Sequence, residues 1–121
     1  MSAFRSIGEI GPRPIWAGTL ARVVHGRELS LAVVELDALA VVAPHQHPNE
    51  QLGIVLQGLL TFTVDGETRE LRPGDTYEIP SNVLHEAKAG PDGAVAIDVF
   101  APVRADWDRF VELATRTPAW P

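Results

Sequence analysis

The sequence contains no cysteine, which excludes disulfide bonds and thiolate metal ligands together. It also lacks any apolar run long enough to span a bilayer, so we expect no membrane segment. The first ten residues do not show the charged-then-apolar layout of a secretory signal. These absences fit a cytoplasmic protein, and we expect that location.

Basic residues are few, because 10 Lys and Arg stand against 16 Asp and Glu, which gives a net charge of −6. An acidic surface repels phosphate backbones, so nucleic acid is not an expected partner. With 121 residues, of which 45% are hydrophobic, the chain has enough material for one core but not for two. We therefore predict a single domain over residues 1–121.

Short strands are the recurring feature of the pattern. The ten glycines and ten prolines are scattered, so they indicate turns between many short elements. Asp65-Gly66 is a strong hairpin signal, since this pair tolerates the positive φ angles of a type I′ turn. β-branched and aliphatic runs predict strands at 19–24, 30–36, 39–42, 51–56, 59–64, 68–71, 76–79, 85–89 and 94–100.

One segment near the end of the chain has a different period. Over residues 105–115, Trp107, Phe110, Val111 and Ala114 recur at three-to-four spacing, which predicts a short C-terminal helix. Closely spaced strands followed by one helix predict an all-β sandwich or barrel, with its core at about residues 18–101.

Three of the four histidines, His45, His47 and His85, are candidate metal ligands. His45 and His47 are two residues apart, so on a strand both rings lie on one face and can converge on an ion. Pro44 and Pro48 restrict the backbone around the pair. The alternative is that both are exposed loop histidines beside prolines.

The segments around these histidines resemble the two motifs of the cupin family. PHQHPNEQLGIVLQG, residues 44–58, matches the first motif, and GDTYEIPSNVLHEA, residues 74–87, matches the second. The resemblance implies a cupin jelly-roll barrel that holds one divalent metal ion. Imidazole ligands suit zinc, nickel or iron, and an amide oxygen tolerates manganese, so the metal is left open among these.

Glu50 and Gln51 compete for the place of the fourth ligand. Positions 45, 47 and 51 share strand parity, so an extended chain turns Gln51 toward the histidines and Glu50 away. A bend at Pro48 and Asn49 would reverse this, and Glu50 therefore stays open as the ligand.

The last predicted strand alternates, with Val95, Ile97 and Val99 on one face and Ala96, Asp98 and Phe100 on the other. Asp98 lies either on the solvent side or, if Ala96 leaves room, in the metal pocket.

The segment IDVFAPVRADW, residues 97–107, resembles the Asp-x-Phe-x-Pro-x-Arg segment of the KdgF-type pectin-degradation cupins. That resemblance implies His45, His47, Gln51 and His85 as metal ligands, Asp98 as the proton-transferring group, Phe100 as a wall of the pocket and Arg104 as the group that holds a sugar carboxylate. A guanidinium suits that task, although Arg104 has the alternative of a surface residue before the helix.

The resemblance implies a small-molecule enzyme that opens and ketonises 4,5-unsaturated monouronates in an isomerase-like reaction. An iron dioxygenase of the cupin type and a non-catalytic binder of small acids are the alternatives. Because cupins commonly dimerise, we expect a homodimer, with Arg13-Pro14-Ile15-Trp16 as a candidate arm that pairs with a second subunit.

Overall fold

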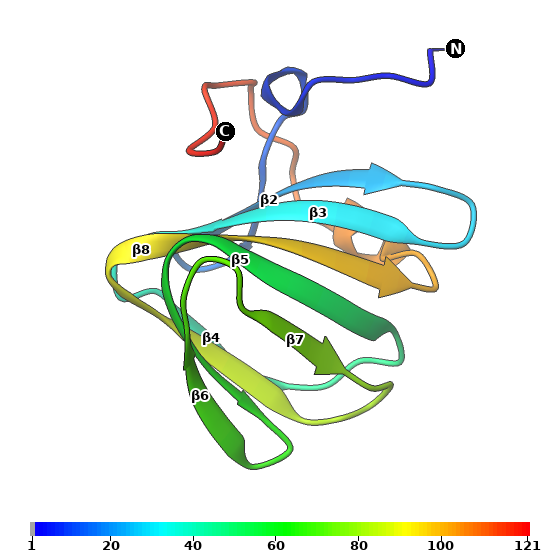
Figure 1. Cartoon of the computed structure of the whole chain (residues 1–121). Coiled ribbons are helices and arrows are strands. Elements are labelled where there is room, and N and C mark those ends of the chain that lie inside the picture. Colours follow the sequence, from blue (N-terminus) through cyan, green and yellow to red (C-terminus); the bar gives the residue numbers. More distant parts are fainter. Residues whose placement is uncertain (1) are drawn as a thin grey trace.

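The computed structural model describes residues 2–121, and strands make up most of its regular structure (Figure 1). The strands are β1 (Arg13–Trp16), β2 (Thr19–His25), β3 (Ser30–Leu36), β4 (Val41–His45), β5 (Glu50–Val64), β6 (Glu67–Leu71), β7 (Thr76–Ile79) and β8 (His85–Ala101). Two short 3-10 helices, η1 (Ile7–Glu9) and η2 (Ala105–Arg109), lie near the ends of the chain. Between residues 2 and 121 no helix has the length and apolarity needed to cross a membrane. The expected all-β jelly roll is thus confirmed.

Two long, bent strands, β5 and β8, join the sheet into two layers. The first part of β5 pairs with the second part of β8 and with β7, and β3, β2 and β1 follow beyond β8. The second part of β5 pairs with the first part of β8 and with β6, and β4 lies on the far side of β8. Each long strand was predicted as two short ones, because glycines interrupt its apolar pattern.

The bend in β5 depends on Gly58. This residue has a φ of 79°, and the pairing register slips on both sides of it, between Val55 and Gln57 and between Gly58 and Leu60. A Cβ atom at Gly58 would lie 2.1 Å from the carbonyl oxygen of Gly93 at the bend of β8. Only glycine therefore lets the two bends cross at this distance.

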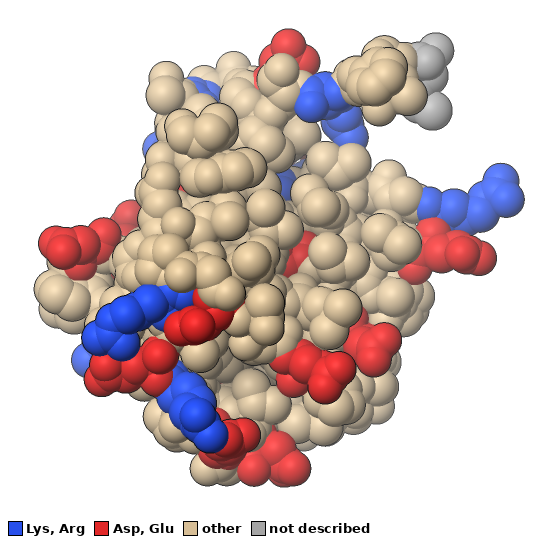
Figure 2. All heavy atoms as spheres, in the orientation of Figure 1, with Lys and Arg blue, Asp and Glu red and all other residues tan. Residues whose placement is uncertain are grey.

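The β5–β6 hairpin forms at Asp65 and Gly66, as the sequence predicts. Both have positive φ angles, 48° and 83°, and Val64 pairs with Glu67 across the turn. Along β6, basic and acidic side chains pair on the surface, so blue and red alternate in this region of Figure 2. Ion pairs between side chains this exposed contribute little to the stability of the fold.

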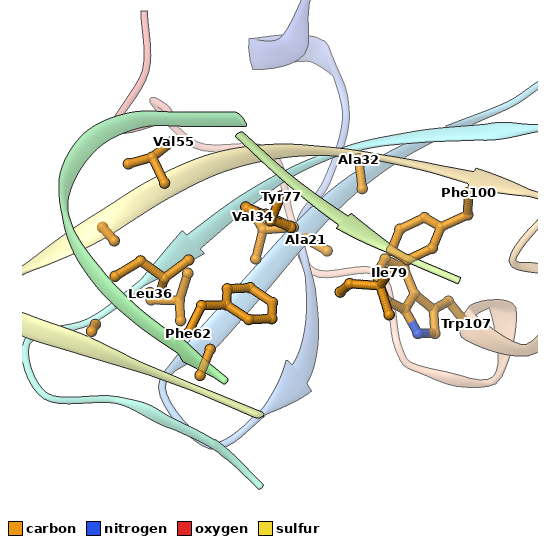
Figure 3. Packing of buried hydrophobic residues seen from close by; sticks show 14 residues of the cluster. Ala21, Ala32, Val34, Leu36, Val55, Phe62, Tyr77, Ile79, Phe100 and Trp107 are labelled. Carbon is orange, nitrogen blue, oxygen red and sulfur yellow. The ribbon is translucent and has the colours of Figure 1, made fainter. Parts of the chain in front are cut away.

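The hydrophobic core fills the space between the layers. Figure 3 shows side chains from both layers pointing toward one another, with Leu36 and Phe62 toward one end and Ile79, Phe100 and Trp107 toward the other. Strand alternation explains which residues form this core, because the inward-facing residues of β3, β5 and β8 are two apart along each strand.

The predicted helix at 105–115 is wrong beyond its first turn. Only Ala105–Arg109 is helical, as a 3-10 helix, and no helix continues over residues 110–121. The Arg13 guanidinium donates hydrogen bonds to the carbonyl oxygens of Asp108 and Phe110. The Leu113 amide donates to the Pro12 carbonyl oxygen at 2.8 Å. Contacts with the N-terminal segment thus replace the hydrogen bonds that a longer helix would need.

The segment Arg13–Trp16 forms strand β1, which pairs antiparallel with β2 of the same chain at the end of the sheet order. Its pairing with a second subunit stays a prediction.

Candidate metal centre and adjoining cavity

The three predicted histidines meet at one end of the space between the layers. His45 ends β4, His85 begins β8, and the two are paired in register, while His47 lies in the loop before β5. One ring nitrogen from each lies within 4.8 Å of those of the other two. The alternative of two exposed loop histidines is therefore wrong for His47, which is only 8% exposed.

Each ring is fixed by a backbone carbonyl two residues away. The Nδ1 atoms of His45, His47 and His85 lie 2.8, 3.0 and 2.8 Å from the carbonyl oxygens of Ala43, Asn49 and Val83. Because a carbonyl oxygen only accepts, Nδ1 carries the proton in all three rings. The lone pair of each ring is then on Nε2, which is the atom that can bind a metal.

The rings are held in the neutral form that metal binding requires. Burial lowers the pKa of His45 and of His47 below the usual 6.5. Burial also lowers the pKa of His85 to about 4, although its bond to Val83 works in the opposite direction. At neutral pH the cluster therefore presents three uncharged nitrogen donors.

Gln51 faces the histidines, whereas Glu50 is exposed. The amide nitrogen of Gln51 donates to Asp98 Oδ1 at 3.0 Å, so its oxygen points the other way, 3.1 Å from His47 Nε2. With the His47 proton on Nδ1, two lone-pair atoms face each other across this gap. A cation between them resolves the conflict, so the donor set of three imidazole nitrogens and one amide oxygen fits a divalent transition metal.

Asp98 lies inside the molecule, so the solvent-facing alternative is wrong. Its side chain is 6% exposed and accepts hydrogen bonds from Tyr77 Oη at 2.5 Å and from Gln51. Burial raises the pKa of Asp98 to about 6, while the bonds from Tyr77 and Gln51 and the charge of Arg104 work against that rise. A carboxyl group with a pKa near neutrality can both accept and return a proton.

Arg104 is also buried, at 7% exposure, rather than a surface residue. Its guanidinium lies over the rings of Phe100 and Trp107, at 4.7 and 4.2 Å from their centres. Nε and Nη2 each donate to Asp106 at 3.1 Å, and no hydrogen bond of Nη1 is found within residues 2–121. Among the described residues that line the cavity, Arg104 is the one Lys or Arg.

The cavity beside the histidines combines a polar wall with an apolar one. The polar groups come from His45, Gln51, Tyr77, His85, Asp98 and Arg104. Trp16 closes one side, with its ring 5.1 Å from that of His45, and Phe100 lies 5.8 Å from the ring of His47. A cavity with one buried guanidinium and an apolar wall suits a small anionic ligand.

Arg22 and His25 lie outside the group of residues that line the cavity. Arg22 pairs with Glu35 and does not line the cavity. His25 is an exposed residue, whose ring nitrogens contact Ser30 Oγ at 2.7 Å and Asp108 Oδ1 at 3.0 Å.

Sequence reasoning did not identify Tyr77 or Ser30 as part of the site. Tyr77 bonds Asp98, and Ser30 Oγ accepts the backbone amide proton of Arg104 at 2.9 Å. The only signal in the sequence was strand alternation: Tyr77 is two residues from the apolar Ile79, so both side chains are expected on the inward face of the same strand.

Comparisons with known proteins agree with this geometry. Residues 32–100 match the family described as the Cupin domain. The chain is 33% identical to the pectin degradation protein KdgF of Dickeya dadantii over 81 residues, which cover 66% of this chain and 74% of that protein. The solved structure of KdgF from Halomonas sp. is 32% identical with a TM-score of 0.81, covering 88% of this chain and 98% of that one. The solved structure of an RmlC-like cupin from Shewanella frigidimarina is 28% identical with a TM-score of 0.82, covering 88% of this chain and 96% of that one.

Fold, family match and the likeness to KdgF over most of the chain lead to one assignment. The chain belongs to the cupin family.

Proposed function

We propose that this cupin is a metal-dependent enzyme of sugar-acid breakdown that ketonises 4,5-unsaturated monouronates. The observation that carries the proposal is the meeting of four features in and beside one cavity. These are the three-histidine cluster, the amide oxygen of Gln51, the buried carboxyl group of Asp98 and the guanidinium of Arg104. The overall likeness of the chain to KdgF, a pectin degradation protein in Dickeya dadantii, supports the substrate class.

The reaction moves one proton from oxygen to carbon. The sugar ring first opens: the C1 hydroxyl group loses its proton and C1 becomes an aldehyde, while the bond from C1 to the ring oxygen breaks and leaves an enol at C5. The enol then loses its hydroxyl proton, its C–O bond becomes a carbonyl, and C4 gains a proton. A single group that takes and returns protons can serve both halves of this change. Asp98 is the buried carboxyl group nearest the ligand set, and we assign the proton transfer to it.

Arg104 and Phe100 hold and enclose the substrate. The Nη1 group of Arg104 is free to bind the substrate carboxylate, while Asp106 and the rings of Phe100 and Trp107 fix the guanidinium plane. Phe100, at 2% exposure, forms a wall that excludes water from the reacting atoms.

His45, His47, Gln51 and His85 would hold the metal ion. When bound, a divalent ion in such a site polarises a substrate oxygen and makes its proton easier to remove. Zinc, nickel, iron and manganese are compatible with these donors.

The direct test adds a purified 4,5-unsaturated galacturonate or guluronate to fully metallated protein and follows the ultraviolet absorbance of the double bond. We expect the absorbance to disappear, and we expect Asp98→Asn to abolish turnover while metal content stays the same. No absorbance change with metallated wild-type protein would refute the proposal. Consumption of oxygen by the iron-loaded form would instead indicate a dioxygenase.

We also propose that the protein acts as a homodimer. Outward-facing residues of the larger layer form an apolar row across neighbouring strands, in which Leu52 pairs with Val99 and Val99 with Leu31. Leu52 is 51% exposed, so a second copy of this face would remove apolar surface from water.

A further inference from the structure

The hydrogen bonds of Asp98 are unevenly divided between its two oxygens. Tyr77 Oη donates to Oδ1 at 2.5 Å, and Gln51 Nε2 donates to the same atom at 3.0 Å. Within residues 2–121 no hydrogen bond reaches Oδ2. Asp98 and Tyr77 both line the cavity, so Oδ2 is the oxygen that remains for a ligand there.

We infer that Tyr77 is a positioning residue, whose hydroxyl group holds Oδ1 of Asp98 so that Oδ2 is the oxygen that takes and returns the substrate proton. This inference rests on the proposed role of Asp98 and adds to it the atom that reacts and the group that orients it. An oxygen that already accepts two hydrogen bonds is a poorer proton acceptor than its free neighbour. Two donors on one oxygen also restrict rotation of the carboxyl group, which keeps the other oxygen in place.

Gly53 provides the space that this arrangement needs. It pairs with both Tyr77 and Asp98, on neighbouring strands on either side of β5. A Cβ atom at position 53 would lie 2.1 Å from Tyr77 Cζ and 2.4 Å from the hydroxyl oxygen. The ring of Tyr77 therefore occupies the place where any other residue would carry its side chain.

The surroundings of Tyr77 would also accept phenylalanine. Its ring lies 4.5 Å from that of Phe62, and the residue belongs to the apolar core. A buried hydroxyl group is unfavourable unless it is hydrogen-bonded, and among the described residues its partner is Asp98. The hydroxyl group thus has one assignable task, the bond to the carboxyl group.

The first test compares steady-state kinetics of metal-loaded wild-type protein and Tyr77→Phe with 4,5-unsaturated galacturonate. We expect kcat to fall about 10-fold, while KM stays within about twofold and metal content is unchanged, because substrate and metal ligands are untouched. The matched control is Thr63→Val, which removes another hydroxyl pair, Thr63 with Thr68 at 2.8 Å, away from the cavity. We expect this control to keep the wild-type kcat.

A second variant moves the ring rather than removing the hydroxyl group. Gly53 does not have a positive φ, so Gly53→Ala leaves the backbone allowed and acts through the clash with Tyr77. We expect kcat to fall at least as far as in Tyr77→Phe. Wild-type kcat in Tyr77→Phe, or a loss that appears in KM alone, would overturn the inference.

A crystal structure of Tyr77→Phe separates this inference from the proposed function. If wild-type protein does not consume the unsaturated uronate, the proposed reaction fails, but the positioning role is still tested by the carboxyl group itself. We expect Asp98 to rotate or to occupy two conformers in the variant. An unchanged, single Asp98 conformer without the tyrosine hydroxyl would refute the role of Tyr77.

Discussion

At the scale of single residues, burial shifts the pKa values of the histidines and of Asp98 in opposite directions. It lowers the pKa values of the three histidines and raises that of Asp98, so both kinds of group favour their uncharged form. The histidines are ready to bind a metal, and Asp98 is able to exchange a proton near neutral pH. One physical cause thus prepares the two parts of the site for different tasks.

The stability of the metal-free protein should report these shifts. Since the folded pKa of His85 is about 4, against 6.5 for an unperturbed histidine, its contribution is present above pH 6.5 and is lost as the pH falls toward 4. Asp98 acts in the opposite sense, because its pKa is raised from 3.8 to about 6, and its contribution is lost as the pH rises through 6. We expect the melting temperature of metal-free protein to fall between pH 6.5 and 4.5. The fall should be steeper in Asp98→Asn, and equal slopes in the two proteins would contradict the buried carboxyl group.

Metal analysis can separate the clustered histidines from the fourth one. We expect His85→Ala to lose bound metal on dialysis, whereas His25→Ala, which removes an exposed ring outside the cluster, should retain the wild-type content. Equal metal content in both variants would exclude the cluster as the binding site.

Much of the site could be predicted from the sequence because its ligands follow strand parity. Parity turned Gln51 toward the histidines and Glu50 away, as found. It could not decide the placement of Asp98, because alternation defines two faces of a strand but not which of them is covered. Tyr77 was missed for a related reason: an aromatic residue on an inward face is usually core, and its hydroxyl partner comes from a strand distant in sequence.

At the scale of elements, the bends of β5 and β8 decide the architecture. Short apolar runs broken by glycine predicted separate strands, but the backbone continues through Gly58 as a bulge. The helix predicted from the spacing of residues 105–115 also failed. Arg13 instead donates hydrogen bonds to carbonyl oxygens of this segment, 95 and 97 residues away along the chain. Local periodicity carries no information about such distant partners.

Two glycines with similar backbone angles test the bend. Gly58 has a φ of 79°, and a Cβ atom there would meet a carbonyl oxygen at 2.1 Å, whereas Gly66 has a φ of 83° and a Cβ atom there would point into open space. Gly66→Ala should lower the free energy of unfolding by about 1 kcal/mol, from backbone strain alone. Gly58→Ala should lower it by more than about 3 kcal/mol, because the bends must also separate. Urea unfolding measures both, and equal losses would show that the crossing of the bends is not constrained.

At the scale of the whole molecule, the two layers have different outer surfaces. The smaller layer carries the paired charges of β6, whereas the larger layer exposes the apolar row that contains Leu31, Leu52 and Val99. In a monomer this row would stay in contact with water, at a cost of roughly 25 cal/mol for each Å² of apolar area. Burial of the row against its own copy would remove this cost, which is the physical basis of the proposed dimer.

Substitution within this row should therefore change the mass of the protein in solution. We expect wild-type protein to elute at twice the 13.1 kDa of one chain and Leu52→Glu to elute as the monomer, because two buried carboxylates would face each other across the interface. Val41→Glu is the matched control, since Val41 has a similar exposure, 54% against 51%, but lies on β4 in the other layer. Light scattering at micromolar concentration measures all three. Dissociation by Val41→Glu would place the interface elsewhere, and a wild-type monomer would remove it. In either case the cavity enclosed within each chain would remain as described.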